Sequence, residues 1–315
     1  MDRRAAVSGW SDAVRLPAPA KINLFLHVTG RRPDGYHVLQ TVFRFLDLAD
    51  DIWLAPAPPG RIERGGGLEG LAPEDDLAVR AARALLARTG VAAGARIVVE
   101  KRIPAGAGLG GGSSDAATVL VGLNRLWGTA LGVDALAALG LTLGADVPVF
   151  VRGHAAWAEG VGEAIVPVHL DPTLYLVVVP PAHVATAAVF GDVALTRNCP
   201  PAKMADFAIA SMGGDCGAVE SGVVALSCRA LEARTTNVCE PVTRRLHPVV
   251  GEAIDRLRAA GLSPRLSGTG GAVFAPVDTA SRARTVAKAL PGDWLCHVAR
   301  GLDRSPLHEA LAGAR

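Results

Sequence analysis

Residues 104–117 read Pro-Ala-Gly-Ala-Gly-Leu-Gly-Gly-Gly-Ser-Ser-Asp-Ala-Ala and contain five glycines. An apolar run at 95–99 precedes them and predicts a strand, and the run from Ser113 to Trp127 predicts a helix. Glycines let the backbone adopt positive φ and approach a ligand closely. A helix N-terminus directs free N–H groups and a positive dipole end at an anion. The stretch therefore predicts a loop that holds a phosphate chain, and a merely flexible linker is the weaker interpretation.

Two familiar phosphate loops fit this stretch less well. A Walker A loop needs a lysine directly after its glycines, and none follows here. Gly106-x-Gly108-x-x-Gly111 formally matches the dinucleotide fingerprint, in the expected context of a strand before and a helix after it. That fold then requires a second parallel strand ending in an acidic residue, whereas this helix leads into another helical stretch. P-loop chemistry is excluded, and a dehydrogenase is disfavoured.

Length and composition bound the class of protein. The chain has 315 residues, which suggests about two domains, and 50% hydrophobic residues suffice for a large core. A net charge of +2 is too small to argue for a nucleic-acid surface. The cysteines number five and form no CxxC pair, so we expect neither a metal cluster nor a disulfide framework, and we expect a cytoplasmic protein.

No segment of the sequence predicts a signal peptide or a membrane helix. Residues 1–14 resemble a flexible tail more than a signal peptide, because the apolar stretch before Asp12 is brief. The apolar run 174–190 contains Pro180, Pro181 and His183, so it is not a membrane helix.

The predicted elements alternate irregularly between strands and helices. Because the strands come partly in blocks, a mixed α+β arrangement is favoured over a doubly wound sheet. The expected strands are 17–29, 37–48, 51–55, 95–103, 174–179 and an edge strand at 295–299, with a second glycine loop, 266–274, leading into another strand. The expected helices are 77–89, 113–127, 133–139, 202–211, 216–232, 238–246, 248–260 and 279–290.

Three motifs in order resemble those of the GHMP kinases, the superfamily of galactokinase and of the homoserine, mevalonate and phosphomevalonate kinases. They are Pro19-Ala-Lys-Ile-Asn-Leu24, the loop at 104–117, and Leu266-Ser-Gly-Thr-Gly-Gly271. The resemblance implies an α+β fold with an N-terminal ribosomal-protein-S5-like domain and a C-terminal α/β sandwich, and an active site in the cleft between them. It divides the chain into a flexible tail (1–16), an ATP-binding domain (17–165) and a C-terminal domain (166–315).

Two further segments narrow the resemblance to the family of GHMP kinases that act on 4-diphosphocytidyl-2-C-methyl-D-erythritol. They are Arg32-Pro-Asp-Gly-Tyr-His37 and Gly144-Ala-Asp-Val-Pro-Val-Phe150, and the similarity runs from about Pro17 to Ser305-Pro-Leu-His308. The resemblance implies ATP-dependent phosphorylation of the substrate's 2-hydroxyl, in the non-mevalonate isoprenoid pathway, with Mg²⁺ as cofactor. The partner is then a small molecule with a cytidine diphosphate group, without nucleic acid or membrane, and the protein a monomer or weak homodimer.

Asp146 and Lys21 are the candidates for the chemistry. Asp146 lies in an apolar stretch, where an unpaired carboxylate is costly, so the residues alone leave open a site or a helix cap. Lys21 lies in an apolar strand and could simply face water. The resemblance pairs them: Lys21 would keep the aspartate ionised and offset charge on the transferred phosphoryl group, while the aspartate abstracts or orients the hydroxyl proton. Asn23 shares a strand face with Lys21 and would contact substrate or orient the pair.

The cytosine end of the substrate calls for aromatic faces and edge hydrogen bonds. The resemblance implies that Tyr36 stacks on the base, that His37 reads its edge, and that Phe190 is the second stacking ring. Thr186 matches a nearby polar contact. Without the family, core packing is the simpler interpretation of Phe190, and Phe43 is a weaker candidate that also fits a core position.

On the nucleotide side, the resemblance implies contacts from Lys101 and from the loop. One departure concerns Asp76, where relatives often carry asparagine, so Asp76 is left out of the expected site. No carboxylate cluster in the sequence marks a metal ligand, and the nucleotide phosphates would supply most of the Mg²⁺ coordination. The expected loop contacts are Pro104, Ala105, Gly106, Ala107, Gly108, Leu109, Gly110, Gly111, Gly112, Ser113 and Ser114.

Two other functions remain as alternatives. A GHMP kinase for mevalonate-type or homoserine substrates would keep the loop but gives no reason for Tyr36-His37 and Phe190. A catalytically inactive nucleotide-binding or regulatory protein would not need Lys21 and Asp146 together.

Overall fold

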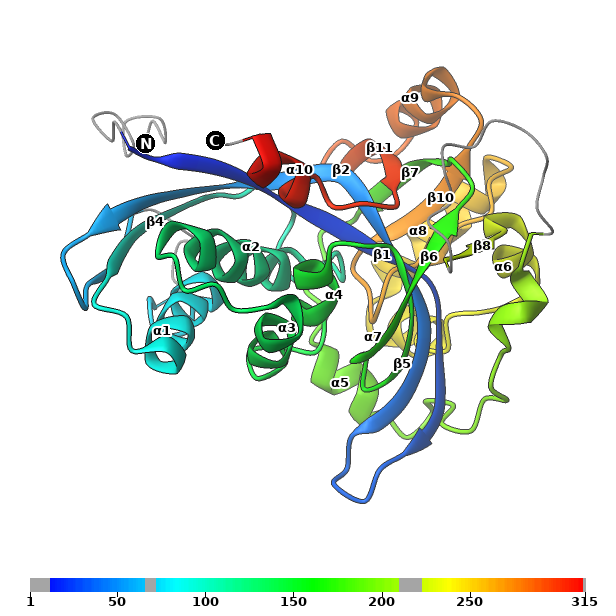
Figure 1. Ribbon diagram of the computed structural model, residues 1–315. Coiled ribbons are helices and arrows are strands. Elements are labelled where there is room, and N and C mark those ends of the chain that lie inside the picture. The colour runs from blue at the N-terminus through cyan, green and yellow to red at the C-terminus, as the bar shows by residue number, and fades with distance from the viewer. Residues whose placement is uncertain (1–11, 66–71, 210–222, 314–315) are drawn as a thin grey trace.

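The computed structural model describes residues 12–65, 72–209 and 223–313. Two long antiparallel strands, β1 (Val14–Arg31) and β2 (His37–Ala57), run through the molecule (Figure 1). A turn at Pro33-Asp34-Gly35 joins them, with Gly35 at a φ of 89°. The sequence predicted two strands, 37–48 and 51–55, where the structure has one. Asp50 and Asp51 do not interrupt it, because both are buried in ion pairs with basic side chains.

A sheet built around β2 extends across both halves of the chain. β2 pairs with β1, β4 (Gly94–Glu100), β5 (Ala156–Gly160) and β11 (Leu295–Leu302). β11 then pairs with β7 (Leu174–Val179), and β7 with β10 (Val273–Val277). Residues 295–299, predicted as an edge strand, pair with β7 on one side, and β11 continues beyond them to pair with β2 at Gly301 and Leu302. The remaining strands are β3 (Ile62–Arg64), β6 (Ala164–Leu170), β8 (Val224–Leu226) and β9 (Arg265–Leu266).

Helices cover the N-terminal part of the sheet and share a core with it. The predicted helix 77–89 has the same bounds in the structure, and the helix after the glycine loop begins at Gly111, because Gly110 provides its left-handed N-cap. The last helix of the chain packs here too, with Leu307 and Leu311 in the same core as Leu16. These helices are α1 (Leu77–Thr89), α2 (Gly111–Leu126), α3 (Val133–Leu141), α4 (Val147–Arg152) and α10 (Pro306–Gly313).

The second half packs its helices around β7 and β10. The predicted helix 202–211 is a short 3-10 turn at Met204–Phe207, with residues 210 and 211 outside the described part. Of the predicted helix 216–232, residues 216–222 lie outside it as well; the rest holds β8 and the start of a helix. The helices are α5 (Thr186–Gly191), α6 (Cys228–Arg234), α7 (Glu240–Leu246), α8 (Pro248–Ala259) and α9 (Ala280–Lys288). The mixed α+β fold is confirmed, while the predicted domain boundary at 165/166 falls inside β6 and stays a prediction.

Candidate active site

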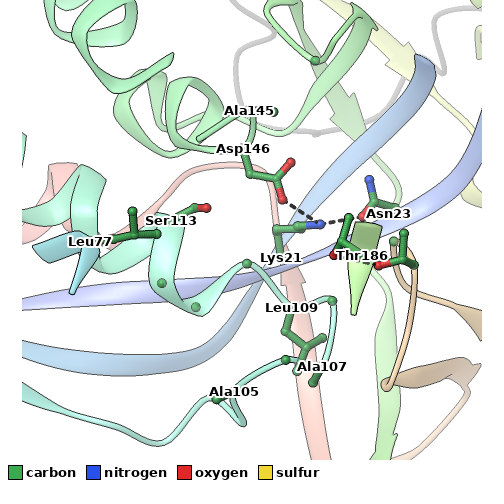
Figure 2. Close-up of a pocket in the computed structure, with 18 of the residues that line it drawn as sticks. Lys21, Asn23, Leu77, Ala105, Ala107, Leu109, Ser113, Ala145, Asp146 and Thr186 are labelled. Carbon is green, nitrogen blue, oxygen red and sulfur yellow. Dashed lines mark hydrogen bonds and ion pairs between the residues drawn. The ribbon is translucent and has the colours of Figure 1, made fainter. Parts of the chain in front are cut away.

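A cavity of about 600 Å³ lies where β1, the glycine loop and the second glycine motif meet (Figure 2). Most of the predicted site residues line it. From the predicted set they are Lys21, Asn23, Lys101, Pro104 to Ser113, Asp146, Thr186 and Phe190, and they are joined by Leu26, Leu39, Thr41, Phe43, Asp75, Asp76, Leu77, Val99, Asp115, Ala145, Val161, Gly162, Gly268 and Thr269.

The glycine loop takes the conformation that its composition predicts. Gly106, Gly108 and Gly110 have φ values of 67°, 73° and 73°, in the region that favours glycine. Gly110 caps α2 without any side-chain hydrogen bond, and the first intrahelical bond runs from the Ser114 N–H to the Gly110 carbonyl. The N–H groups at the start of α2 therefore remain available to an anion.

The second glycine motif holds the loop from the other half of the chain. The Ser267 hydroxyl donates to the Gly108 carbonyl (3.0 Å), and the Ala272 N–H donates to the Ala107 carbonyl (2.8 Å). Asn237 in turn donates to the Leu266 carbonyl (2.8 Å) from beneath the motif. Asn237 could not be predicted as part of the site, because an isolated asparagine before a helix is typical of an ordinary cap.

Lys21 and Asp146 meet at the centre of the cavity, as Figure 2 shows. The Lys21 Nζ lies 3.1 Å from the Asp146 Oδ2, with 4% of the lysine side chain and 32% of the aspartate side chain exposed. Asp146 immediately precedes α4 but makes no side-chain capping bond. Its carboxylate is turned to Lys21 instead, so the helix-cap interpretation of Asp146 is wrong.

Asn23 is held by its neighbours on three sides. Its side-chain oxygen accepts from the Lys21 ammonium (2.6 Å), and its Nδ2 donates to the Thr41 hydroxyl (3.0 Å). Its backbone N–H donates to the Ser267 hydroxyl (3.4 Å). A buried amide with both ends engaged has one orientation. The Lys21 ammonium, which also lies over the Phe43 ring, is thereby fixed toward Asp146.

Lys101 lines the cavity, but two carboxylates already surround its ammonium. The Nζ lies 2.5 Å from the Asp50 Oδ2 and 2.7 Å from the Asp115 Oδ2. Burial, joined by the charge of Asp50 and opposed by that of Lys101, raises the pKa of Asp115 to about 7. Burial lowers the pKa of Lys101, but the two carboxylates together more than offset this and raise it. Neither acid was expected at the site, because Asp50 lies 51 residues from Lys101 along the chain and Asp115 was interpreted only as part of the helix after the glycine loop.

Asp76 also lines the cavity, at the start of α1. Its Oδ1 accepts from the Ala78 N–H (2.9 Å), and its Oδ2 lies 2.8 Å from the Arg64 Nε. A neutral asparagine would cap the helix equally well but would leave the guanidinium without this charge partner. The aspartate at this position is therefore matched by Arg64.

The residues that were predicted to contact a cytosine base are only partly brought together. Thr186 and Phe190 project from α5, and the Thr186 hydroxyl lies 3.1 Å from that of Thr269. The Phe190 ring stacks on His37, with centroids 5.3 Å apart and 26° between the planes. Tyr36 lies in the β1–β2 turn with 66% of its surface exposed, and it does not line the cavity. Its stacking role stays a prediction.

Within residues 12–65, 72–209 and 223–313, no three His, Cys, Asp or Glu side chains gather into a group that could hold a metal ion. Over the same residues, the longest apolar helices fall short of what a membrane crossing requires.

Two models of the GHMP kinase family match the chain. The model of the GHMP kinases N terminal domain matches residues 76–154, and that of the GHMP kinases C terminal matches residues 218–294. The strands β5, β6 and β7 and the helix α5 lie between the two matches, while β1, β2 and β3 precede the first match.

Curated proteins and solved structures resemble the chain over nearly its whole length. It is 52% identical over 301 residues to a 4-diphosphocytidyl-2-C-methyl-D-erythritol kinase of Halorhodospira halophila, covering 95% of this chain and 96% of that protein. The kinase of the same name from Xanthomonas axonopodis pv. citri is 51% identical, over 93% and 92% of the two chains. A crystal structure of 4-(cytidine 5'-diphospho)-2C-methyl-D-erythritol kinase superposes with a TM-score of 0.74 at 36% identity, over 92% of this chain and all of that one. A homoserine kinase from Cytophaga hutchinsonii, at 17% identity and a TM-score of 0.63, shares the fold over 94% and 96% of the chains.

Proposed function

This chain belongs to the 4-diphosphocytidyl-2-C-methyl-D-erythritol kinases of the GHMP superfamily, and we propose that its cleft transfers the γ-phosphoryl group of ATP to the substrate's 2-hydroxyl. One observation carries the proposal. The Lys21–Asp146 pair, 3.1 Å apart, lines the same cavity as the open N-terminus of α2. A phosphate cradle and a charged pair beside it are what phosphoryl transfer to an alcohol requires.

Asp146 receives or orients the proton of the attacking hydroxyl. Its carboxylate is partly exposed to the cavity, while one oxygen faces Lys21. The lysine stabilises negative charge that spreads over the transferred group. Because the transition state is loose, positioning of the hydroxyl matters more than full proton abstraction. Asn23 acts by holding the lysine, through the 2.6 Å bond to its ammonium.

The glycine loop binds the triphosphate of ATP. Positive-φ glycines bring the backbone close to the phosphates, and the free N–H groups of residues 111–113 point at them. The carboxylates of Asp50 and Asp115 neutralise the charge of Lys101. Lys101 therefore contributes more to the shape of this side of the cavity than to the attraction of phosphate. Ser114 is fully buried, so it supports the start of α2 from the core side.

Mg²⁺ would reach the site bound to the phosphates of ATP. A Cβ built on Gly144 would lie 3.7 Å from the Ser113 hydroxyl, so that hydroxyl faces the loop that carries Asp146. A hydroxyl and a carboxylate oxygen suit a Mg²⁺ ion that keeps phosphate and water ligands. Ser113 and Asp146 would hold the ion, which when bound neutralises charge on the phosphates.

The cytidine group occupies the side of the cavity formed by α5 and the start of β2. Thr186 and Phe190 line that side, and His37 lies against Phe190. Tyr36 on the adjacent turn is free to fold over the base as the second stacking ring. We also propose a cytoplasmic monomer or weak homodimer that binds no nucleic acid, with two domains that divide at 165/166. The predicted tail 1–16 is too long at its C-terminal end, because residues 14–16 belong to β1. Four free cysteines, Cys199, Cys228, Cys239 and Cys296, support a reducing compartment.

The test is ATP consumption with a panel of hydroxyl substrates at fixed enzyme and ATP. We expect turnover with 4-diphosphocytidyl-2-C-methyl-D-erythritol and none above background with mevalonate or homoserine. Phosphorus NMR of the product should show a new phosphomonoester while the cytidine diphosphate group stays intact. Turnover of mevalonate or homoserine without turnover of the cytidyl compound would overturn the proposal.

A further inference from the structure

One side chain, Arg197, ties α5 to the strand that carries His37. Its guanidinium donates to three backbone carbonyls in α5 and the segment after it: Phe190 (2.9 Å), Asp192 (2.7 Å) and Leu195 (3.2 Å). These bonds use the two Nη atoms, and Nε donates to the Nε2 of His37, 160 residues away in the sequence, at 3.0 Å. The rings of His37 and Phe190 stack on each other. The same guanidinium therefore binds the backbone of Phe190 and the Nε2 edge of the His37 ring.

Donor and acceptor can be assigned in the hydrogen bond between Arg197 and His37. A guanidinium is always protonated and has no acceptor, so the His37 Nε2 must be the acceptor. The ring is then neutral and carries its proton on Nδ1. Burial, helped by the charges of Arg197 and Arg31, lowers the pKa of His37 and keeps the ring neutral near pH 7. Nδ1 is the nitrogen left for a substrate, and it is a donor.

We propose that Arg197 is a positioning residue that sets which edge of a pyrimidine His37 can recognise, an inference that rests on the proposed function. Cytosine offers acceptors at N3 and O2 and a donor at its amino group, whereas uracil carries a proton on N3. A donor at Nδ1 pairs with the cytosine N3 and opposes the uracil N3–H. Arg197 therefore selects cytosine over uracil while it holds Phe190 in place for stacking.

Arg245 provides a matched control for this arrangement. It forms an ion pair with the Asp192 side chain in the same segment, but the His37 ring is not among its partners. Replacing either arginine by methionine removes a guanidinium from this segment and keeps an unbranched apolar stem. A purely structural role in the segment would give similar effects for both variants.

The kinetic test compares Arg197→Met with Arg245→Met. For Arg197→Met we expect the KM for the cytidyl substrate to rise about tenfold, which corresponds to the loss of one charge-assisted hydrogen bond. The KM for ATP should stay within about twofold, because the glycine loop is untouched. For Arg245→Met both KM values should stay within about twofold. Equal effects of the two variants on the cytidyl substrate would overturn the inference.

Two further readouts separate positioning from structure. Nitrogen-15 NMR of His37 should show protonated Nδ1 and bare Nε2 in the wild type and in Arg245→Met, with protonated Nε2 appearing in Arg197→Met. CMP should inhibit the wild type better than UMP, and this ratio should fall about tenfold in Arg197→Met alone. A wild-type ring protonated on Nε2, or an unchanged CMP-to-UMP ratio in Arg197→Met, would overturn the inference; the wild-type measurement decides even if the variant does not fold.

The results that would overturn the proposed function differ from those that would overturn only the role of Arg197. A wild type that ignores the cytidyl substrate but phosphorylates another alcohol would end the proposed function and with it the role of Arg197 in base selection. A wild type that phosphorylates the cytidyl substrate, with Arg197→Met matching Arg245→Met, ends only the role of Arg197.

Discussion

At the scale of single residues, Lys21 and Asp146 form the charged pair on which the proposed chemistry depends. Lys21 is almost fully buried and Asp146 is one-third exposed, so the carboxylate is the member that a substrate can reach. The lysine has no other charged partner among the contacts described for it, only the Asn23 amide and the Phe43 face. Loss of the carboxylate would therefore leave a buried ammonium without its counter-charge.

Asp146→Asn should lower kcat by at least about 10²-fold while the affinity for ATP changes less than about threefold. The amide cannot accept the hydroxyl proton, whereas the loop that binds the phosphates is intact. Steady-state kinetics and ATP titration measure the two effects. Asp134→Asn is the control, because Asp134 is an exposed aspartate paired with Arg152 on neighbouring helices. Near-normal turnover in Asp146→Asn would remove Asp146 from the mechanism.

Asp115 makes the stability of the fold depend on pH. Its pKa is about 7 in the folded protein and near 3.8 when unfolded, so between these values the folded state holds a proton that the unfolded state has released. Its contribution to the free energy of unfolding is full below pH 4 and declines as pH rises toward 7, by up to about 1.4 kcal/mol per pH unit. Urea denaturation from pH 5 to 8 should show a flatter profile for Asp115→Asn than for wild type or Asp134→Asn. Parallel profiles would contradict this.

At the scale of elements, the glycine loop depends on close approach to the second glycine motif. Gly108 combines a φ of 73° with a backbone contact, since a Cβ there would collide with the Ser267 carbonyl. Gly128 has a similar φ of 64° and nothing within 4 Å of a built Cβ. An alanine at Gly128 would introduce conformational strain alone, whereas an alanine at Gly108 would introduce both strain and a collision.

Gly108→Ala should raise the KM for ATP at least about tenfold, because both the strain of a left-handed residue and the collision displace the loop. Gly128→Ala should leave the KM for ATP within about twofold and cost only about 1–2 kcal/mol of stability from its φ. Initial rates at varied ATP and urea denaturation measure the two effects. Equal KM values for the two variants would show that the contact with Ser267 is not required.

Elements with local signals were predictable, and those defined by distant partners were not. The bounds of α1 follow from the Asp76 cap and the left-handed Gly90 that ends the helix. The pairing of β11 with β7 and β2 could not be predicted, because its partners lie more than a hundred positions away along the chain. The same holds within the site: the glycine loop is continuous in sequence, whereas the contact of Arg197 with His37 joins residues 160 positions apart.

At the scale of the whole molecule, the C-terminal residues fasten the two halves together. β11 lies between β2 and β7, and α10 then packs onto β1 with its leucines in the N-terminal core (Figure 1). The cavity lies between the parts that this connection holds in register. Losing contacts of α10 should therefore destabilise the fold well away from the cavity.

Leu307→Ala should lower the free energy of unfolding by about 2–5 kcal/mol, since the side chain is 1% exposed in a packed core. Leu295→Ala, at a half-exposed position on β11, should cost less than about 1 kcal/mol. Urea denaturation measures both. Equal midpoints for the two variants would mean that α10 contributes little to the N-terminal core.

The position of α10 also constrains how the protein is made. The core that contains Leu16 is completed by Leu307 and Leu311, so the first half of the chain lacks part of its packing until these two leucines have been synthesised. At about 5–20 residues per second, the roughly 150 residues between the first half and α10 take about 8–30 seconds to synthesise. During that interval the apolar surface of the first half is open to chaperones, and the docking of α10 closes it.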